Sequence, residues 1–341
     1  MLRSLKKLAA VGRMSVSAFW GLLQYRRNGH ISKHIWNDLL WAHCASNGRT
    51  TELLNLITRI TRPPRKRASA DGLLGYFDVA RQQDIVAALN RDGYYIFPEL
   101  LPDDVCDEIQ DFAANAQTIV ETNRDLKSPL VRYDSSHPIS RTYKIMEKDS
   151  IRNRGIQQIV ADPVFVAIAE SYLGTLPVIG RVDAWWSACY GNQPGSDAAQ
   201  LFHFDFDAPP AWLKLFVYLT DVGPDNGPHV YVRESHKAGL VQAREFRSRG
   251  YERITDEEMA AMFGADKLVE IGGKRGTVFM ADTRGFHKGK FPTEGHRLIA
   301  QVVYCSPIFN DYIDPPPPPV EQHPAFAAAV ASSPAIYARY Q

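Results

Sequence analysis

The second half of the chain carries short hydrophobic runs that alternate with polar residues and are separated by Gly, Pro and Asn. Such runs are typical of β-strands joined by tight turns. Many short strands with this punctuation favour a sandwich, a jelly roll or a small barrel. The predicted strands are 178–190, 201–207, 213–219, 229–233, 277–280 and 297–304.

Helical spacing dominates the chain before these strands. Residues 84–89 predict a helix, 94–97 a short strand, and Pro102-Asp-Asp104 opens a second helix, since acidic residues suit a first turn. A further helix is expected from Asp162-Pro163 to near Gly174, and residues 251–263 predict an acidic helical insertion. The expected fold is therefore mostly β with flanking helices, an α+β class.

The first 67 residues also predict helices, because Leu5, Leu8, Phe19 and Leu23 keep roughly helical spacing. Residues 62–67 read as an exposed linker, and Pro315–Pro319 as a stiff polyproline spacer. We expect three regions: a basic helical extension with its linker over 1–70, a body over 71–312, and a Pro-rich tail over 313–341.

Charge is distributed unevenly along the 341 residues, although the net charge is only +1. Residues 1–70 carry 13 Lys and Arg against Asp38 and Glu52, so the remainder is acidic overall. A basic amphipathic helix can lie on an anionic membrane surface, and the alternative is a helix docked on the body or on a partner subunit. Residues 1–27 would make such a peripheral membrane contact.

Other features bound the location and the partners of the protein. No run approaches the ~20 apolar residues of a membrane span. The four scattered cysteines include no CxxC pair, so a cytoplasmic setting is expected, with membrane association as an alternative. The absence of acids before Asp38 leaves mitochondrial targeting open. The basic run 62–67 lacks interleaved aromatic residues, so no nucleic-acid partner is expected.

The candidate chemistry lies in His203-Phe-Asp205, in His287, which follows His203 by 84 positions, and in Arg297, ten residues further on. Two histidines and a carboxylate can hold one face of an Fe(II) ion. Strict alternation would place Asp207 beside both ligands, with Phe202, Phe204 and Phe206 facing a core. An inward-facing Arg297 needs an anion, either an internal carboxylate or a bound dicarboxylate, and the histidines favour the dicarboxylate.

Other polar and aromatic residues are assigned weaker roles. His229, His236 and His296 are not expected to bind metal: His236 should stabilise its local turn and His296 should face solvent. The remaining candidates would line an apolar pocket or meet an anionic group of the substrate. They are Trp185, Trp186, Tyr190, Arg132 and Arg141.

Over roughly residues 76–312 the chain resembles the phytanoyl-CoA dioxygenase family of Fe(II)/2-oxoglutarate oxygenases. The resemblance rests on the order and spacing of several blocks, which are 89–97, 100–104, 203–205, 219–227, 234–237, 276–280, His287 and Arg297. It implies a double-stranded β-helix (jelly-roll, cupin-like) core for the body. The chain departs from the family pattern at two places. Arg233-Glu234 replaces the usual Pro-Gly, and Gly289 stands where some members place a serine that contacts the co-substrate.

The resemblance also implies roles for individual residues. His203, Asp205 and His287 would be the iron ligands, and Arg297 would bind the distal carboxylate of 2-oxoglutarate. Lys144, in Tyr143-Lys-Ile145, matches a family lysine that can reach the co-substrate. Phe216 matches an aromatic lining position.

The function implied is hydroxylation of an unactivated C–H bond with 2-oxoglutarate and O2 as co-substrates and with release of succinate and CO2. The carboxylate of Asp205 favours hydroxylation over halogenation, while desaturation and cyclisation stay open. The substrate would be a small or lipid-linked molecule, and nothing in the sequence indicates an oligomeric state. The alternatives are a zinc hydrolase, against which Arg297 argues, and a catalytically silent jelly-roll binding protein, against which the complete ligand set argues.

Overall fold

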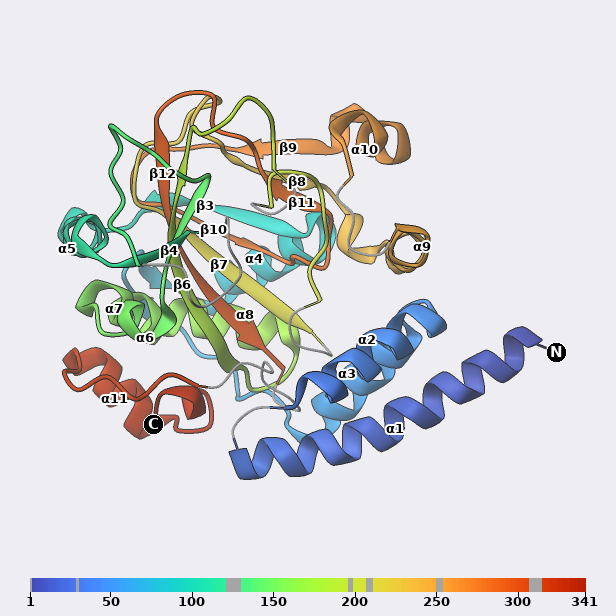
Figure 1. Cartoon of the computed structure of the whole chain (residues 1–341). Helices are drawn as coiled ribbons and strands as arrows, with labels where there is room; N and C mark the ends of the chain where they lie inside the picture. Colours follow the sequence, from blue (N-terminus) through green and yellow to red (C-terminus); the bar gives the residue numbers. More distant parts are fainter. Residues whose placement is uncertain are drawn as a thin grey trace.

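Two antiparallel β-sheets form the centre of the computed structural model, which describes residues 2–28, 31–120, 130–195, 199–206, 211–249, 254–306 and 315–341. The larger sheet has seven strands in the order β3-β10-β7-β12-β6-β5-β4 (Figure 1). In that order the strands are Tyr94–Leu100, Thr277–Ala281, Trp212–Tyr218, His296–Cys305, Val178–Ala188, Thr142–Ile145 and Thr118–Val120.

The smaller sheet has the order β11-β8-β9 and lies against the inner face of the larger one. Its strands are His287–Gly289, His229–Val232 and Leu268–Ile271. Phe216 and Phe279 of the larger sheet share one apolar cluster with Tyr231 and Ile271 of the smaller sheet. This pair of facing sheets is the double-stranded β-helix, or jelly-roll, core that the sequence predicted.

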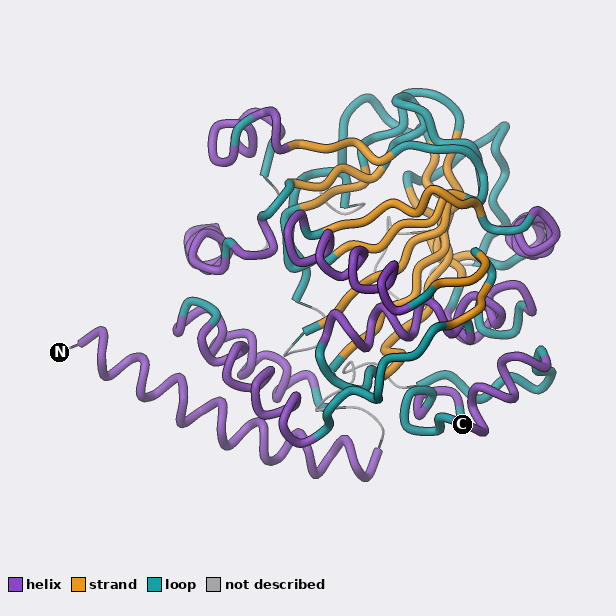
Figure 2. The backbone as a smooth tube through the Cα atoms, turned by 180° about the vertical axis from the view of Figure 1, so that it is seen from behind, coloured by secondary structure: helices purple, strands orange, loops and turns teal. Residues whose placement is uncertain are grey.

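Helices cover the outer face of the larger sheet, and Figure 2 shows them lying across its strands. They are α4 (Val79–Asp92), α5 (Asp103–Asn115), α6 (Glu147–Ser150), α7 (Arg154–Ala161), α8 (Pro163–Leu173) and α11 (Pro324–Ser332). The start of α8 follows from local chemistry, because the carboxylate of Asp162 accepts hydrogen bonds from the N–H groups of Val164 and Phe165. Gly174 ends the helix with a φ of 68°, which confirms the predicted bounds.

Three N-terminal helices, α1 (Leu2–Asn28), α2 (Lys33–Ser46) and α3 (Arg49–Thr61), pack together beside this core (Figure 1). The helix α2 also packs against the jelly-roll core. Its Leu40 and Cys44 bury themselves against Phe206 and Trp212, and the indole N–H of Trp36 donates to the carbonyl of Phe206 at 3.1 Å. The helical prediction for this region is confirmed. None of the helices in the described part of the chain has the length and hydropathy of a membrane span.

The C-terminal segment packs into the main core, which its Pro-rich sequence did not indicate. Beyond the irregular residues 315–319, Phe326 and Tyr340 join the main apolar core. Arg339 and Tyr340 donate hydrogen bonds to the carboxylate of Glu147. The three-region division at 70 and 312 stays a prediction.

Two predicted elements differ from the structure. Residues 201–206 make only isolated bridges, Phe202 with Ile254 and His203 with His287, and Asp207 lies outside the described residues. The two bridging partners belong to different segments, and past His203 only the N–H of Asp205 in the described segment bonds to the turn at 282–286, through the carbonyl of Thr283, so no ladder continues. The insertion helix α10 begins only at Asp256, where Thr255 and Glu258 form a capping box.

Short elements complete the described chain. They are β1 (Ala70–Gly72), β2 (Gly75–Phe77), η1 (Ser235–Lys237), α9 (Gly239–Arg249), α10 (Asp256–Phe263), η2 (Ala265–Lys267) and η3 (Ala338–Tyr340). The sequence pattern did not predict α9. Val241 of α9 and Met259 of α10 share an apolar cluster with Val230 of β8, and both helices lie beyond one end of the smaller sheet in Figure 1.

Candidate active site

Three side chains that could hold a metal ion meet between the two sheets. His203 and Asp205 come from the irregular segment 199–206, and His287 is the first residue of β11. One ligand atom from each lies within 4.8 Å of the others. Nε2 of His203 is 3.8 Å from one oxygen of Asp205, and Nε2 of His287 is 3.3 Å from the other.

Backbone groups orient both imidazoles. Nδ1 of His203 lies 3.0 Å from the carbonyl of Leu201, and Nδ1 of His287 lies 2.9 Å from the carbonyl of Gly285. A carbonyl can only accept, so each ring carries its proton on Nδ1 and turns the lone pair of Nε2 toward Asp205. Reciprocal backbone hydrogen bonds between His203 and His287 hold the two segments together.

Lys214 of β7 keeps the carboxylate of this cluster ionised. Its ammonium group donates to Asp205 at 2.7 Å, and both side chains are largely buried. Burial alone would raise the pKa of Asp205, but the ammonium charge of Lys214 holds that pKa well below its ordinary value. A metal ligand must be deprotonated, so the cluster has the ionisation state that binding needs. Lys214 was not among the predicted site residues, although a lysine within an otherwise apolar strand is a signal that could have revealed it.

Arg297 lies on the inner face of β12, and only 4% of it is exposed. Its guanidinium donates to the carbonyl of Gly227 and, at 3.2 Å, to the hydroxyl of Ser187. No carboxylate among the described residues pairs with it, and its Nε finds no acceptor there. Burial lowers the pKa of Arg297, because a charge in the interior without a partner of opposite charge is unfavourable. The arrangement fits a bound anion better than an internal salt bridge.

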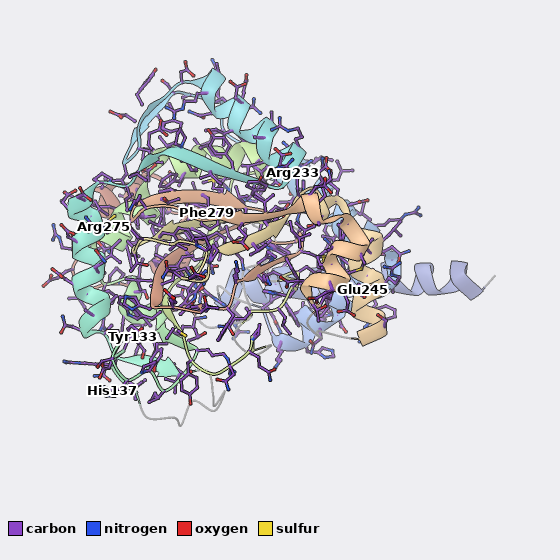
Figure 3. All side chains as sticks on the ribbon, turned by 90° about the horizontal axis from the view of Figure 1, so that it is seen from above. Tyr133, His137, Arg233, Glu245, Arg275 and Phe279 are labelled. Atoms are coloured by element: carbon purple, nitrogen blue, oxygen red, sulfur yellow. The ribbon has the colours of Figure 1, made fainter. Side chains whose placement is uncertain are left out.

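Lys144 and Phe216 share this inner face with Arg297. The ammonium group of Lys144 on β5 lies 3.0 Å from the carboxylate of Asp183, which also accepts a hydrogen bond from Gln301 at 3.0 Å. Burial opposes ionisation of Asp183, yet the nearby charge of Lys144 holds its pKa below the ordinary value. Phe216 stacks on Phe279 with ring centroids 4.9 Å apart. Figure 3 shows Phe279 inside the molecule.

His229 of β8 lies in the same interior, although the sequence gave it no role. Its ring lies nearly parallel to that of His287, with centroids 5.4 Å apart and an angle of 13° between the planes. It also contacts Phe216 and Phe279. Burial holds the pKa of His229 well below its ordinary value, and the charge of Arg297 lowers it further. The imidazole is therefore neutral at physiological pH.

The other histidines lie away from the metal cluster. Nε2 of His236 contacts the carbonyl of Asn90 at 3.3 Å, and its Nδ1 has no partner among the described residues. The ring therefore bonds to the distant helix α4, and not within its own turn as predicted. The prediction that His296 faces solvent is wrong, because its ring packs against Tyr133 and Trp186. This end of the outer face of β12 is covered by the segment that contains Tyr133.

The two adjacent tryptophans divide between the two faces of β6. Trp186 belongs to the main core on the outer face of the sheet. Trp185 packs against the cluster between the sheets, on the side of the metal ligands. Of the two, only Trp185 is therefore placed to line a pocket there. Arg141, which was also predicted to contact the substrate, donates a hydrogen bond to the carbonyl of Gln193 at 3.3 Å.

The chain is similar to several known proteins. L-proline trans-4-hydroxylase from Streptomyces griseoviridis is 23% identical over 258 residues, which are 69% of this chain and 90% of that protein. The solved structure of EctD from S. alaskensis with bound Fe is 20% identical, with a TM-score of 0.47 over 77% of this chain and 88% of that chain. HygX from Streptomyces hygroscopicus with nickel and 2-oxoglutarate bound is 15% identical, with a TM-score of 0.47 over 67% and 89%.

A family model also matches the chain. Residues 89–293 match the family model described as phytanoyl-CoA dioxygenase (PhyH), and this range is more than half of the chain. It spans the whole His–Asp–His cluster and most of both sheets. The chain therefore belongs to the phytanoyl-CoA dioxygenase family and is an Fe(II)- and 2-oxoglutarate-dependent oxygenase.

Proposed function

We propose that this protein hydroxylates an unactivated C–H bond of a small molecule, with 2-oxoglutarate and O2 as co-substrates and with succinate and CO2 as products. One observation carries the proposal. A metal-binding cluster of His203, Asp205 and His287 lies in the same interior as Arg297, a buried cation without a carboxylate partner among the described residues. A metal and a dicarboxylate would complete this interior together.

Each side chain has a task in this scheme. His203, Asp205 and His287 would hold Fe(II), and Lys214 would keep Asp205 ionised and oriented. Arg297 would bind the distal carboxylate of 2-oxoglutarate through its guanidinium. Bound iron supplies the activation of O2 and the oxidation of the C–H bond. The surrounding aromatic wall, which includes Phe216 and Phe279, would exclude water from that chemistry.

The substrate we favour is a polar small molecule that carries charge. The inner face of the sheet presents Lys144 and Asp183 as an ion pair, and the side chain of Lys144 is 38% exposed. A charged substrate group could exchange partners with this pair at little electrostatic cost, whereas a purely apolar substrate would leave it unused. The relative named L-proline trans-4-hydroxylase supports the same class of substrate.

We further propose that α1 and α3 contact an anionic membrane, which would also bring a lipid-linked substrate near the protein. On α1, Val16, Phe19, Trp20 and Leu23 form an exposed stripe at helical spacing. On α3, a second exposed stripe of the same spacing consists of Leu53, Leu56, Ile57 and Ile60. The excess of Lys and Arg in residues 1–70 suits an anionic lipid surface.

Vesicle sedimentation tests the membrane proposal. The wild-type protein should sediment with phosphatidylserine-containing vesicles and much less with neutral phosphatidylcholine vesicles. Phe19→Glu/Trp20→Glu should lose that binding, because two charges would enter the apolar stripe. Leu240→Glu, which changes an exposed leucine outside α1 and α3, is the matched control. Equal sedimentation of all three proteins would contradict the proposal.

An anaerobic titration tests the enzymatic proposal. Addition of Fe(II) and then 2-oxoglutarate to the wild-type protein should produce the visible charge-transfer band of a chelated keto acid. The band should be absent in His203→Ala, and Arg297→Ala should need more 2-oxoglutarate to develop it. His137→Ala is the control, because His137 is exposed and lies at the periphery in Figure 3. A wild-type protein without the band, but with tightly bound zinc, would favour a hydrolase instead.

A further inference from the structure

His229 projects into the space beside Arg297. In the register of the smaller sheet it lies opposite Gly289 of β11. Antiparallel partners extend their side chains to the same face of a sheet. A Cβ atom on Gly289 would lie 3.1 Å from a guanidinium nitrogen of Arg297, so this face looks onto Arg297. Because Gly289 has no side chain, His229 is the member of this register pair that presents a side chain on that face.

The same ring also reaches toward the metal cluster. It lies nearly parallel to His287, with 5.4 Å between the ring centroids. Phe216 and Phe279 close its other sides. The backbone N–H of His229 donates to the hydroxyl of Tyr218 at 2.9 Å, and that hydroxyl donates to the carbonyl of Ile271 at 2.6 Å. The strand therefore holds the imidazole between His287 and Arg297.

One nitrogen of this buried ring has no partner. His229 is 5% exposed, and its Nε2 makes no hydrogen bond to any residue that the structure describes. A buried polar atom without a partner is costly, so such atoms in native proteins usually await a ligand or a water molecule. Nε of Arg297 is in the same condition. A neutral imidazole and a guanidinium, each with one nitrogen that lacks a partner among the described residues, are the groups that would recognise a carboxylate.

We infer that His229 is a binding residue for the distal carboxylate of 2-oxoglutarate, to which its Nε2–H donates a hydrogen bond while Arg297 neutralises the charge. The inference rests on the proposed function, because it assumes that 2-oxoglutarate binds between the metal cluster and Arg297. It assigns to β8 the contact that Gly289 on β11 has no side chain to make. His229 is neither a metal ligand nor a proton carrier in this scheme.

The test compares two keto acids that differ in the distal carboxylate. Binding of 2-oxoglutarate and of 2-oxopentanoate to the anaerobic Fe(II)-loaded protein is followed by calorimetry and by the charge-transfer band. His229→Leu should weaken 2-oxoglutarate by about tenfold or more, because a hydrogen bond to a charged group is lost. Its affinity for 2-oxopentanoate, which lacks that carboxylate, should stay within about twofold of the wild-type value. His229→Gln, which keeps a donor, should recover part of the loss.

His137→Leu serves as the matched control, and the Fe(II) affinity of each variant shows whether the metal cluster is intact. Unchanged 2-oxoglutarate affinity in His229→Leu would overturn the inference. Equal losses for both keto acids would also overturn it, since the ring would then act only as a wall of the cavity. A wild-type protein that binds neither keto acid would refute the proposed function itself, which separates the two failures.

Discussion

The two faces of the larger sheet differ in what they contain. On β12, Leu298 and Tyr304 turn outward into the apolar core beneath the helices. Arg297 and Gln301 turn inward, toward the smaller sheet. Successive residues of one strand thus serve different ends, because side chains alternate between the faces of a sheet. The outer face supplies stability, and the inner face holds polar groups that a stable fold alone would not need.

The inner face of the larger sheet buries charged groups, which is costly unless each charge has a partner. Asp205 is paired with Lys214 and Asp183 with Lys144, so each buried carboxylate has a cation. Arg297 has no such partner among the described residues. Replacing buried ions by apolar residues of similar size is often neutral or stabilising. The comparison between faces can therefore be tested with neighbouring residues of one strand.

Leu298→Ala should produce the largest change, and it should be confined to stability. Leu298 is fully buried, so its truncation removes apolar contact and leaves a cavity that costs about 2–5 kcal/mol. Urea unfolding would measure this loss. The affinity of the folded protein for 2-oxoglutarate should be unchanged, and a parallel loss of affinity would show that the faces are coupled.

Arg297→Met, one residue earlier, should have the opposite effect. Its affinity for 2-oxoglutarate should fall by about a hundredfold, since charge-assisted hydrogen bonds are lost. Its free energy of unfolding should be equal to or higher than that of the wild type, because a buried unpaired cation is removed. Calorimetry and urea unfolding measure the two quantities. A large loss of stability would mean that Arg297 is a structural residue.

Lys214→Met should change metal binding by a smaller factor. Loss of the hydrogen bond that orients Asp205 should weaken Fe(II) by about tenfold or more. At saturating Fe(II) the affinity for 2-oxoglutarate should return to the wild-type value, because Lys214 acts through Asp205. Equilibrium dialysis with Fe(II) or Co(II) measures the effect. A persistent loss of 2-oxoglutarate affinity would place Lys214 in direct contact with the co-substrate.

The smallest predicted effect concerns acid. The pKa of Asp183 in the folded protein lies below its ordinary value of 3.8, although burial opposes this, because Lys144 and Arg181 stabilise the carboxylate. Its contribution to stability is therefore complete above the unfolded pKa and is lost as the pH falls through the folded pKa. Asp183→Asn should flatten the decline of unfolding free energy between about pH 5 and pH 3. Identical declines in urea unfolding would contradict this assignment.

The strands of the core could be predicted from sequence because alternation reports burial on two faces. Alternation along residues 297–304 assigns Arg297 and Gln301 to one side of β12 and Leu298 and Tyr304 to the other, as the structure has them. The same rule failed at 201–207. There the polar and aromatic residues do alternate, but Phe202 and His203 bridge single residues of two different segments, Ile254 and His287. Period-two spacing therefore indicates which side chains share a side, and not whether a ladder forms.

Parts of the site depend on contacts between distant segments, and local pattern does not record these. His229 gained a place beside Arg297 only through the pairing of β8 with β11. His296 lost its expected exposure because Tyr133, far away in sequence, covers it. The docking of α2 through Trp36 on Phe206 is likewise a long-range contact. Each depends on the pairing of segments that the sequence presents far apart.

The position of β12 within its sheet bears on how the protein folds. This strand lies between β7 and β6, yet it follows both in the chain by many residues. During synthesis β6 and β7 must wait for residues 296–305 before they can form their central ladders, so folding should be slow and strongly non-local. Since β12 also carries Arg297, the strand that completes the sheet also brings the residue that we propose to bind the co-substrate. A chain interrupted before that step would lack the centre of its larger sheet and its anion site together.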